Sequence, residues 1–377
     1  MAKSAVLEVK EGKVREALGD LWRQLLERGL VDALLVPQVL PSGDNVVQTL
    51  VRDADALSTP DALAPVMPVN SARLVSQMTK VTPSPLKVGA VLRPCELRAL
   101  VELVKLKQAS LENVVVIGTD CLGTYAIAEY RRRAADSPGL SDEFIRSATQ
   151  GTQDPQVREA CQMCEYPAPT GADLVIGFIG TDPAKGVLVQ ALTPQGEALF
   201  DGLGLAEGGD ADAQRREQAI AELVSQRQRR RDEVFAATER EAKGLEQLLA
   251  VLSPCIKCHN CRTVCPICYC KECFFDSPTF EMEAEKYLGW AERRGAIRMP
   301  TDTLLFHLTR MNHMAISCVG CGMCSEACPN DIPVANLFRW VAAGVQDVFH
   351  YVPGRSVEEE LPLATFKEDE LQEVGRR

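Results

Sequence analysis

Eight cysteines form two copies of one spacing, Cys-x-x-Cys-x-x-Cys-x-x-x-Cys-Pro. The first copy comprises Cys255, Cys258, Cys261 and Cys265, and the second comprises Cys318, Cys321, Cys324 and Cys328. Three thiolates spaced in this way on a tightly turning backbone can bind three irons of one 4Fe–4S cubane, and the fourth usually reaches the other cluster. Zinc ribbons use pairs of Cys-x-x-Cys instead. The spacing therefore predicts electron transfer through at least two 4Fe–4S clusters.

Four more cysteines occur in the first half of the chain. Cys95 and Cys121 each follow a short apolar run, and Cys161 and Cys164 form a Cys-x-x-Cys pair. Ligands of open α/β sheets gather beyond the carboxyl ends of the strands, so both single thiols should face one crevice. The pair could complete a set of four. We expect a third 4Fe–4S cluster here; the alternatives are zinc and ordinary burial of Cys95 and Cys121 in the core.

Three cysteines remain beside the first quartet, namely Cys268, Cys270 and Cys273. They could complete a further cluster, replace one of the ligands named above, or be spare thiols. His259 lies inside the first quartet, where we expect it to tune a cluster by hydrogen bonding rather than to bind iron.

The pattern of apolar residues up to about residue 200 predicts an α/β fold with a mostly parallel sheet. We expect a helix over residues 14–26, ended by Gly29, and a second helix over 96–107. The second helix joins two strands and so favours a right-handed parallel crossover. The expected strands are residues 31–36, which Pro37 should end, 87–92, 113–117, 173–179 and 186–190.

The remainder of the chain divides into three parts. Residues 201–250 combine a glycine-rich linker (201–210) with a long charged helix (211–250). Residues 251–345 form the two-cluster ferredoxin domain, which is mainly helical, with helices expected near 280–290 and 302–311. Residues 346–377 are an acidic tail. Residues 1–200 are the α/β domain.

Composition restricts where the protein works and what it binds. The 377-residue chain has 15 cysteines, starts without an apolar signal region and has no apolar run of about 18 residues. We therefore expect no transmembrane segment and a cytoplasmic protein, at most peripheral to a membrane complex, whose cysteines bind metal. The net charge of −11 argues against nucleic acid as a partner.

Three segments carry a resemblance to a known family. Residues 88–95, 116–121 and 161–164, the last followed by 171–177, resemble in order and spacing the beta-subunit family of deazaflavin-reducing (coenzyme F420) hydrogenases and formate dehydrogenases. The resemblance covers roughly residues 10–200. It implies FAD beside a 4Fe–4S cluster, and electron exchange between clusters and a soluble hydride carrier. It also implies that the ligands of that cluster are Cys95, Cys121, Cys161 and Cys164.

The cysteine-rich region resembles a second group of proteins. The quartets start 318 − 255 = 63 residues apart with helix-like sequence between them, similar to the helical ferredoxin modules of heterodisulfide reductase and succinate dehydrogenase subunits. The resemblance implies that Cys255, Cys258, Cys261 and Cys328 bind one cluster. It assigns Cys318, Cys321, Cys324 and Cys265 to the other.

The sequence contains no convincing acid–base or nucleophilic set. We therefore expect an iron–sulfur electron-transfer subunit of a multi-subunit redox complex, linking a formate dehydrogenase, hydrogenase or heterodisulfide-reductase-like partner to another carrier. Where family members have paired glycines before the first helix, this chain has Gly12-Lys13. Flavin therefore rests on the resemblance alone. The alternatives are a flavin-free cluster relay and a ferredoxin-fed flavin reductase with its own substrate.

Overall fold

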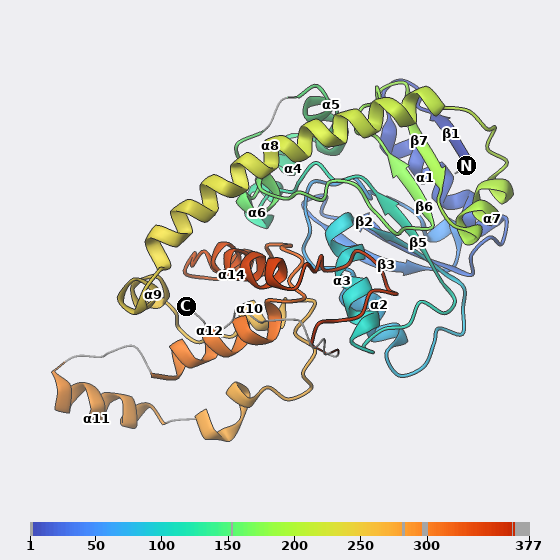
Figure 1. Cartoon of the computed structure of the whole chain (residues 1–377). Coiled ribbons are helices and arrows are strands. Elements are labelled where there is room, and N and C mark those ends of the chain that lie inside the picture. Colours follow the sequence, from blue (N-terminus) through green and yellow to red (C-terminus); the bar gives the residue numbers. More distant parts are fainter. Residues whose placement is uncertain (1–2, 152–153, 281–282, 296–300, 364, 366–377) are drawn as a thin grey trace.

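A computed structural model describes residues 3–151, 154–280, 283–295, 301–363 and 365. It consists of an α/β region, which holds the N-terminus, and a helical region that carries both cysteine quartets (Figure 1). The predicted fold class, an α/β region followed by a mainly helical cluster region, is confirmed. In the part of the chain that is described, no helix is both long and apolar enough to cross a membrane.

One seven-stranded sheet organises the α/β region, in the order β1-β7-β6-β5-β4-β2-β3. The strands are β1 (Lys3–Glu8), β2 (Ala33–Val39), β3 (Val46–Val51), β4 (Val88–Leu92), β5 (Val114–Thr119), β6 (Leu174–Gly177) and β7 (Gly186–Ala191). The central strands β2, β4, β5 and β6 are parallel, whereas β3, β7 and β1 pair antiparallel with their neighbours. The sheet is therefore mixed rather than mostly parallel.

The expected end of the second strand at Pro37 was wrong. Strand β2 continues to Val39, and Pro37 lies opposite Gln48 of β3. The pairing of β2 with β4 stops at Leu35. Proline, which lacks an N–H donor, thus stands where β2 has a partner strand on one side only, and this is where a sheet tolerates it.

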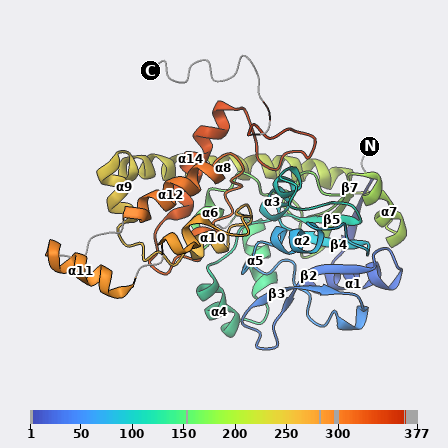
Figure 2. The ribbon, with the colours of Figure 1, turned by 90° about the horizontal axis from the view of Figure 1, so that it is seen from below.

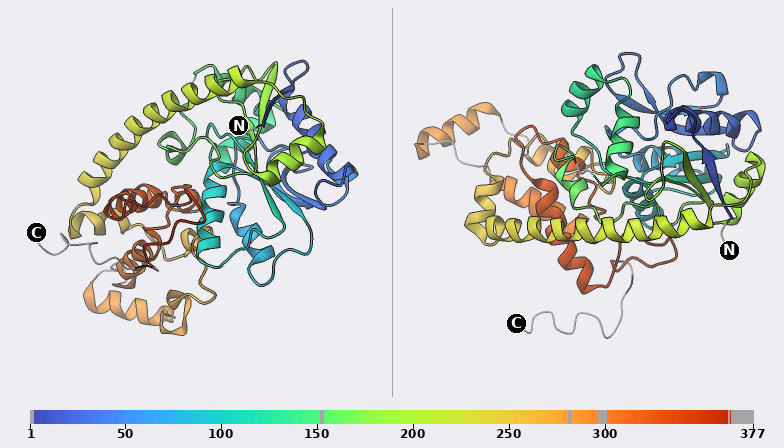
Figure 3. Two further views of the ribbon diagram at one scale, coloured as in Figure 1. Left: turned by 45° about the vertical axis from the view of Figure 1, so that its right-hand side comes forward. Right: turned by 90° about the horizontal axis from the view of Figure 1, so that it is seen from above.

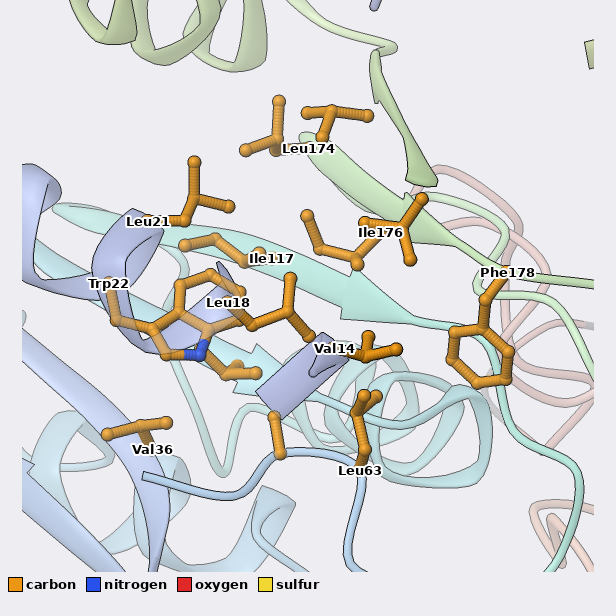
Figure 4. Close-up of a cluster of buried hydrophobic side chains, with 14 of the residues drawn as sticks. Val14, Leu18, Leu21, Trp22, Val36, Leu63, Ile117, Leu174, Ile176 and Phe178 are labelled. Atoms are coloured by element: carbon orange, nitrogen blue, oxygen red, sulfur yellow. The ribbon is translucent and has the colours of Figure 1, made fainter. Parts of the chain in front are cut away.

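The helices of the α/β region cover both faces of the sheet. They are α1 (Val14–Glu27), α2 (Ala72–Thr79), α3 (Pro94–Lys105), α4 (Ile127–Asp136), α5 (Leu140–Thr149), α6 (Glu159–Gln162) and α7 (Pro194–Leu203). Helices α1 and α7 pack on one face, where Leu18, Trp22 and Ile117 share a core (Figure 4). Helices α2 and α3 pack on the opposite face, in a core that continues into the helical region.

The helical region begins with one long helix. Helix α8 (Asp210–Ala242) runs from the sheet to α9 (Leu245–Leu252), as both views in Figure 3 show. The single helix expected over 211–250 is broken at Gly244, whose φ of 110° is incompatible with a helix. The remaining helices are α10 (Asn260–Thr263), α11 (Ala284–Arg294), α12 (Thr301–Met314), α13 (Met323–Glu326) and α14 (Val334–Val348). Helix α11 stands apart from the rest in Figures 1 and 2.

A buried ion pair fixes α8 to the end of β5. The Asp120 carboxylate accepts hydrogen bonds from the backbone N–H groups of Phe178 (3.0 Å) and Ile179 (3.1 Å) and from Arg216 Nε (3.1 Å). Asp120 is 3% exposed. Because Asp120 precedes Cys121, this pair also fixes the loop that carries the cysteine.

We expect Arg216→Met to destabilise the chain by about 3 kcal/mol, because it leaves a buried carboxylate without its cation. Urea unfolding measures the change. The double variant Arg216→Met/Asp120→Asn should regain much of the loss, since a neutral amide needs no counter-charge. A single variant as stable as the wild type would contradict a structural role for the pair.

Candidate metal centres

The two quartet loops share one backbone conformation. Lys257 and His259 in the first loop, and Gly320 and Gly322 in the second, occupy equivalent positions with φ of 59°, 56°, 70° and 76°. Residues in this left-handed backbone conformation turn the chain tightly, so that the three closely spaced cysteines of a loop can surround one metal site. Burial raises the pKa of Cys255 and Cys318, and the backbone N–H two residues further on hydrogen-bonds each thiolate and opposes the shift.

The first loop places non-glycine residues in this costly conformation. Lys257 forms an ion pair with Asp302, and the His259 ring stacks on Phe306 with a centroid distance of 4.3 Å. His259 Nδ1 also lies 2.6 Å from a carboxylate oxygen of Asp276. The described contacts of His259 are thus with a carboxylate and an aromatic ring, so the expected hydrogen bond to a cluster gains no support from them.

The first cluster set brings together cysteines of both quartets. Burial raises the pKa of Cys255, and the neighbouring thiolates of Cys258 and Cys328 raise it further. Burial also raises the pKa of Cys261, Arg310 lowers it, and the thiolates of Cys255, Cys258 and Cys328 raise it further. The structure thus places Cys328 beside the first three cysteines, as the resemblance implied. Cys258 is the exposed member of this set.

The second cluster set surrounds a small cavity. Its walls include Cys265, Cys318, Cys321 and Cys324, together with Arg310, Met323 and Phe338. Burial raises the pKa of Cys321 to about 12, and the thiolates of Cys265 and Cys318 add to the effect. Cys265 therefore lies with the three cysteines of the other quartet.

A third set gathers at the carboxyl edge of the sheet. Cys95 lies in the first turn of α3, after β4, and Cys121 follows β5. Cys161 and Cys164 come from α6 and the loop after it. Burial raises the pKa of Cys95, and Glu96, Cys121, Cys321 and Cys164 raise it further. Burial also raises the pKa of Cys121 to about 11, with Cys161 among the groups that contribute.

Gly123 allows the Cys121 loop to approach α6. Its φ is 120°, and a Cβ there would lie 2.6 Å from Val157 Cγ1 and 3.3 Å from Cys161 Cβ. Any side chain at residue 123 would therefore push the loop away from Cys161. The sequence alone gives no reason for a glycine at residue 123, whereas the contacts with Val157 and Cys161 do.

The second and third sets adjoin. A Cβ on Gly322, in the second quartet, would lie 2.5 Å from Ala160 Cβ of α6. Arg158 contacts residues of both sets. Its Nη2 lies 3.7 Å from Cys161 Sγ in the third set, and its Nη1 lies 3.8 Å from Sδ of Met323, which lines the cavity of the second set. Although burial acts against it, Arg158 together with Thr124 lowers the pKa of Cys161. The three sets thus follow one another through the protein.

The chemistry of the donors fits iron–sulfur clusters, because each set offers four thiols, the usual ligands of a 4Fe–4S cubane. Within the described ranges, no three His, Cys, Asp or Glu side chains are arranged to hold a single metal ion. In a 4Fe–4S cubane each of the four irons binds one cysteine, so the four sulfur atoms lie further apart than the ligands of a single metal ion.

Two residues that contact cysteines of the first set could not be identified from the sequence. His307 Nε2 lies 3.4 Å from Cys255 Sγ, and burial, with Arg310 and His259, lowers the pKa of His307 to about 4. Arg310 donates to Cys261 Sγ at 3.1 Å. Both come from α12, about 50 residues from the cysteines that they contact, so only the fold brings them there.

Of the three remaining cysteines, Cys268 lies beside Cys265 of the second set. Burial raises the pKa of Cys268 to about 11, with Cys265 and Cys270 as its thiol neighbours. Cys270 is exposed, and Cys273 is half-buried.

A cavity of about 180 Å³ opens next to the third set. Its walls combine apolar side chains, among them Met67, Val91 and Leu92, with Gln48, Ser71, Arg93 and Glu96. Met67 Sδ lies 3.9 Å from Cys95 Sγ. The apolar walls suit a flat ring system.

The charged groups of this cavity, Arg93 and Glu96, already form hydrogen bonds within the protein. The Arg93 guanidinium donates to the Ala64 and Val66 carbonyls, and Glu96 accepts from Ser71. Lys13, which the sequence singled out, lies on the surface 3.3 Å from a carboxylate of Glu11 and 3.4 Å from one of Glu16. The cavity therefore fits the ring of a flavin better than its phosphates.

Two family models match the chain. Residues 86–210 match the family described as the C terminus of the coenzyme F420 hydrogenase/dehydrogenase beta subunit. Residues 251–332 match the family described as a 4Fe-4S dicluster domain. The first match contains Cys95, Cys121, Cys161 and Cys164, and the second contains both quartets.

Curated relatives match along nearly their whole length. The F420-dependent formate dehydrogenase subunit beta of Methanocaldococcus jannaschii is 27% identical over 378 residues, covering 92% of this chain and 93% of the relative. The F420-dependent formate dehydrogenase 1 subunit beta of Methanococcus maripaludis is 28% identical over 397 residues, covering 96% and 95%. A chain of the F420-reducing NiFe hydrogenase complex from Methanosarcina barkeri is similar with a TM-score of 0.45 and 15% identity, covering 65% of this chain and 94% of that chain.

Proposed function

We propose that this chain is the electron-transferring beta subunit of a multi-subunit redox complex. Two matches support the proposal. Residues 86–210 match the coenzyme F420 hydrogenase/dehydrogenase beta-subunit family, and residues 251–332 match the 4Fe–4S dicluster domain. In this proposal the chain joins a dehydrogenase or hydrogenase partner to a soluble deazaflavin carrier. The names of the relatives, which are beta subunits of F420-dependent formate dehydrogenases, favour formate dehydrogenase as the partner.

The observation that carries the proposal is the succession of three four-cysteine sets. The first set has an exposed member, Cys258, and the third lies beside the cavity next to Cys95. The second set lies between them, next to Ala160 and Arg158. When bound, clusters in these sets would carry single electrons, which a flavin can combine in pairs, with a proton, into a hydride.

The protein's own residues do three things in this scheme. The cysteines supply the ligands, and the buried walls around Cys95 and Cys324 keep water away. Backbone N–H groups and the arginines Arg158 and Arg310 place positive charge at the sulfur atoms. Hydrogen bonds to sulfur, burial and net charge are the means by which proteins set cluster potentials.

We assign FAD to the cavity beside Cys95 on the strength of the family and of the apolar walls. Acid release of flavin from anaerobically purified protein, with iron counted on the same sample, tests this assignment. We expect about one FAD and about 12 irons per chain, four for each cubane. The same iron without flavin would make the chain a relay between clusters, and the hydride chemistry would then belong to another subunit.

A further inference from the structure

One buried arginine contacts both sets of the dicluster domain. Arg310 lies in α12, and its Nη1 donates to Cys261 Sγ at 3.1 Å while Nη2 donates to the Cys261 carbonyl at 3.0 Å. The same side chain forms part of the wall around the second set. The Arg310 side chain therefore lies between the first set, which it contacts through Cys261, and the second set, whose cavity it lines.

Arg310 has no carboxylate partner in the described part of the chain. It is 4% exposed, and its nearest flat neighbours are the rings of Phe338 at 4.8 Å and Phe306 at 5.6 Å. Arg216, which is also buried, pairs with the carboxylate of Asp120. Because an unpaired buried charge is costly, the counter-charge of Arg310 has to come from the thiolates themselves.

The position of this charge has a definite electrostatic consequence. Reducing a 4Fe–4S cluster adds one negative charge to a site that already carries four thiolates. A fixed positive charge next to the ligands stabilises the reduced form more than the oxidised form. Screening by salt is weak for buried charges. A cation in this place therefore raises the reduction potential.

We propose that Arg310 sets the reduction potentials of both clusters of the dicluster domain, by donating to Cys261 and by sharing its charge with the second set. This inference rests on the proposed function, since it requires clusters in both sets. It assigns to Arg310 the task of keeping the two potentials high and close together, so that electrons pass in either direction.

Redox titration followed by low-temperature EPR tests the proposal on the full chain, with iron counted first. We expect the Arg310→Met variant to keep its iron and to have more negative reduction potentials at both clusters. At a fixed solution potential, the ratio of reduced to oxidised cluster should fall about tenfold, which corresponds to a shift of ~59 mV for each cluster. Arg310→Lys keeps the charge and should restore most of the shift. Arg52→Met removes an exposed arginine of the α/β region and should leave both potentials unchanged.

Unchanged potentials in an iron-replete Arg310→Met variant would overturn the proposal. A shift of the first cluster alone would overturn the shared role. If Arg310→Met loses iron, Arg310→Gln, which keeps hydrogen-bond donors without the charge, takes its place: a negative shift of both potentials supports the charge argument, and unchanged potentials overturn it. Wild-type protein without iron would instead refute the proposed function, so the two failures are distinguishable.

Discussion

Replacing Cys121 by serine is expected to remove about four of about 12 irons per chain while leaving the dicluster intact. Cys121 lies at the carboxyl end of β5 with Cys95 and Cys161 as thiol neighbours. Serine is nearly isosteric, so the loop held by Asp120 and Gly123 should keep its shape, but an alkoxide is a poor ligand in this position. Iron analysis and the EPR spectrum of the reduced protein measure the loss.

Cys270→Ser is the matched control, because Cys270 is exposed and belongs to none of the three sets. It should retain the full iron content. Unchanged iron in Cys121→Ser would refute the third site. Loss of iron in Cys270→Ser would show that the group Cys268, Cys270 and Cys273 binds a cluster of its own or supplies a ligand to one.

Serine in place of Cys265 is expected to deplete the second cluster, although Cys265 belongs to the first quartet. The reason is its position, since Cys265 lies in the wall around Cys318, Cys321 and Cys324. By the same reasoning, Cys328→Ser should deplete the first cluster, because Cys328 neighbours Cys255 and Cys261. Each variant should lose about four irons.

Two reference variants make the assignment unambiguous. Cys258→Ser removes a ligand of the first set, and Cys321→Ser removes a ligand of the second. The EPR spectrum of Cys265→Ser should match that of Cys321→Ser, and the spectrum of Cys328→Ser should match that of Cys258→Ser. The opposite pairing would mean that each quartet binds its own cluster.

Much of the central fold could be predicted because its strands are buried on both faces. The apolar runs that became β4 and β5, with α3 between them, are continuous and end in turn residues. Strands β1 and β3 were missed because they lie at the edges of the sheet. Their residues are partly exposed, for example Val6 at 47% and Leu50 at 43%, so apolar and polar positions are mixed.

The cysteines could be named from sequence because their spacing is a local property of one loop. The grouping of Cys95 and Cys121 followed from the rule that ligands gather at the carboxyl ends of parallel strands. The residues around the sulfur atoms could not be predicted in this way. Arg158, next to α6, and His307 and Arg310, in α12, contact their cysteines through tertiary packing, which no sequence spacing records.

We propose that three adjoining cysteine sets bind iron–sulfur clusters that exchange electrons. Low-temperature EPR of the dithionite-reduced protein, with iron and acid-labile sulfide counted on the same sample, tests it most directly. The structure predicts about 12 irons and as many sulfides per chain, and a spectrum broadened by magnetic interaction, because neighbouring sets adjoin at Gly322 and Arg310. Protein that contains zinc without acid-labile sulfide, or that gives the spectrum of isolated clusters, would contradict the account.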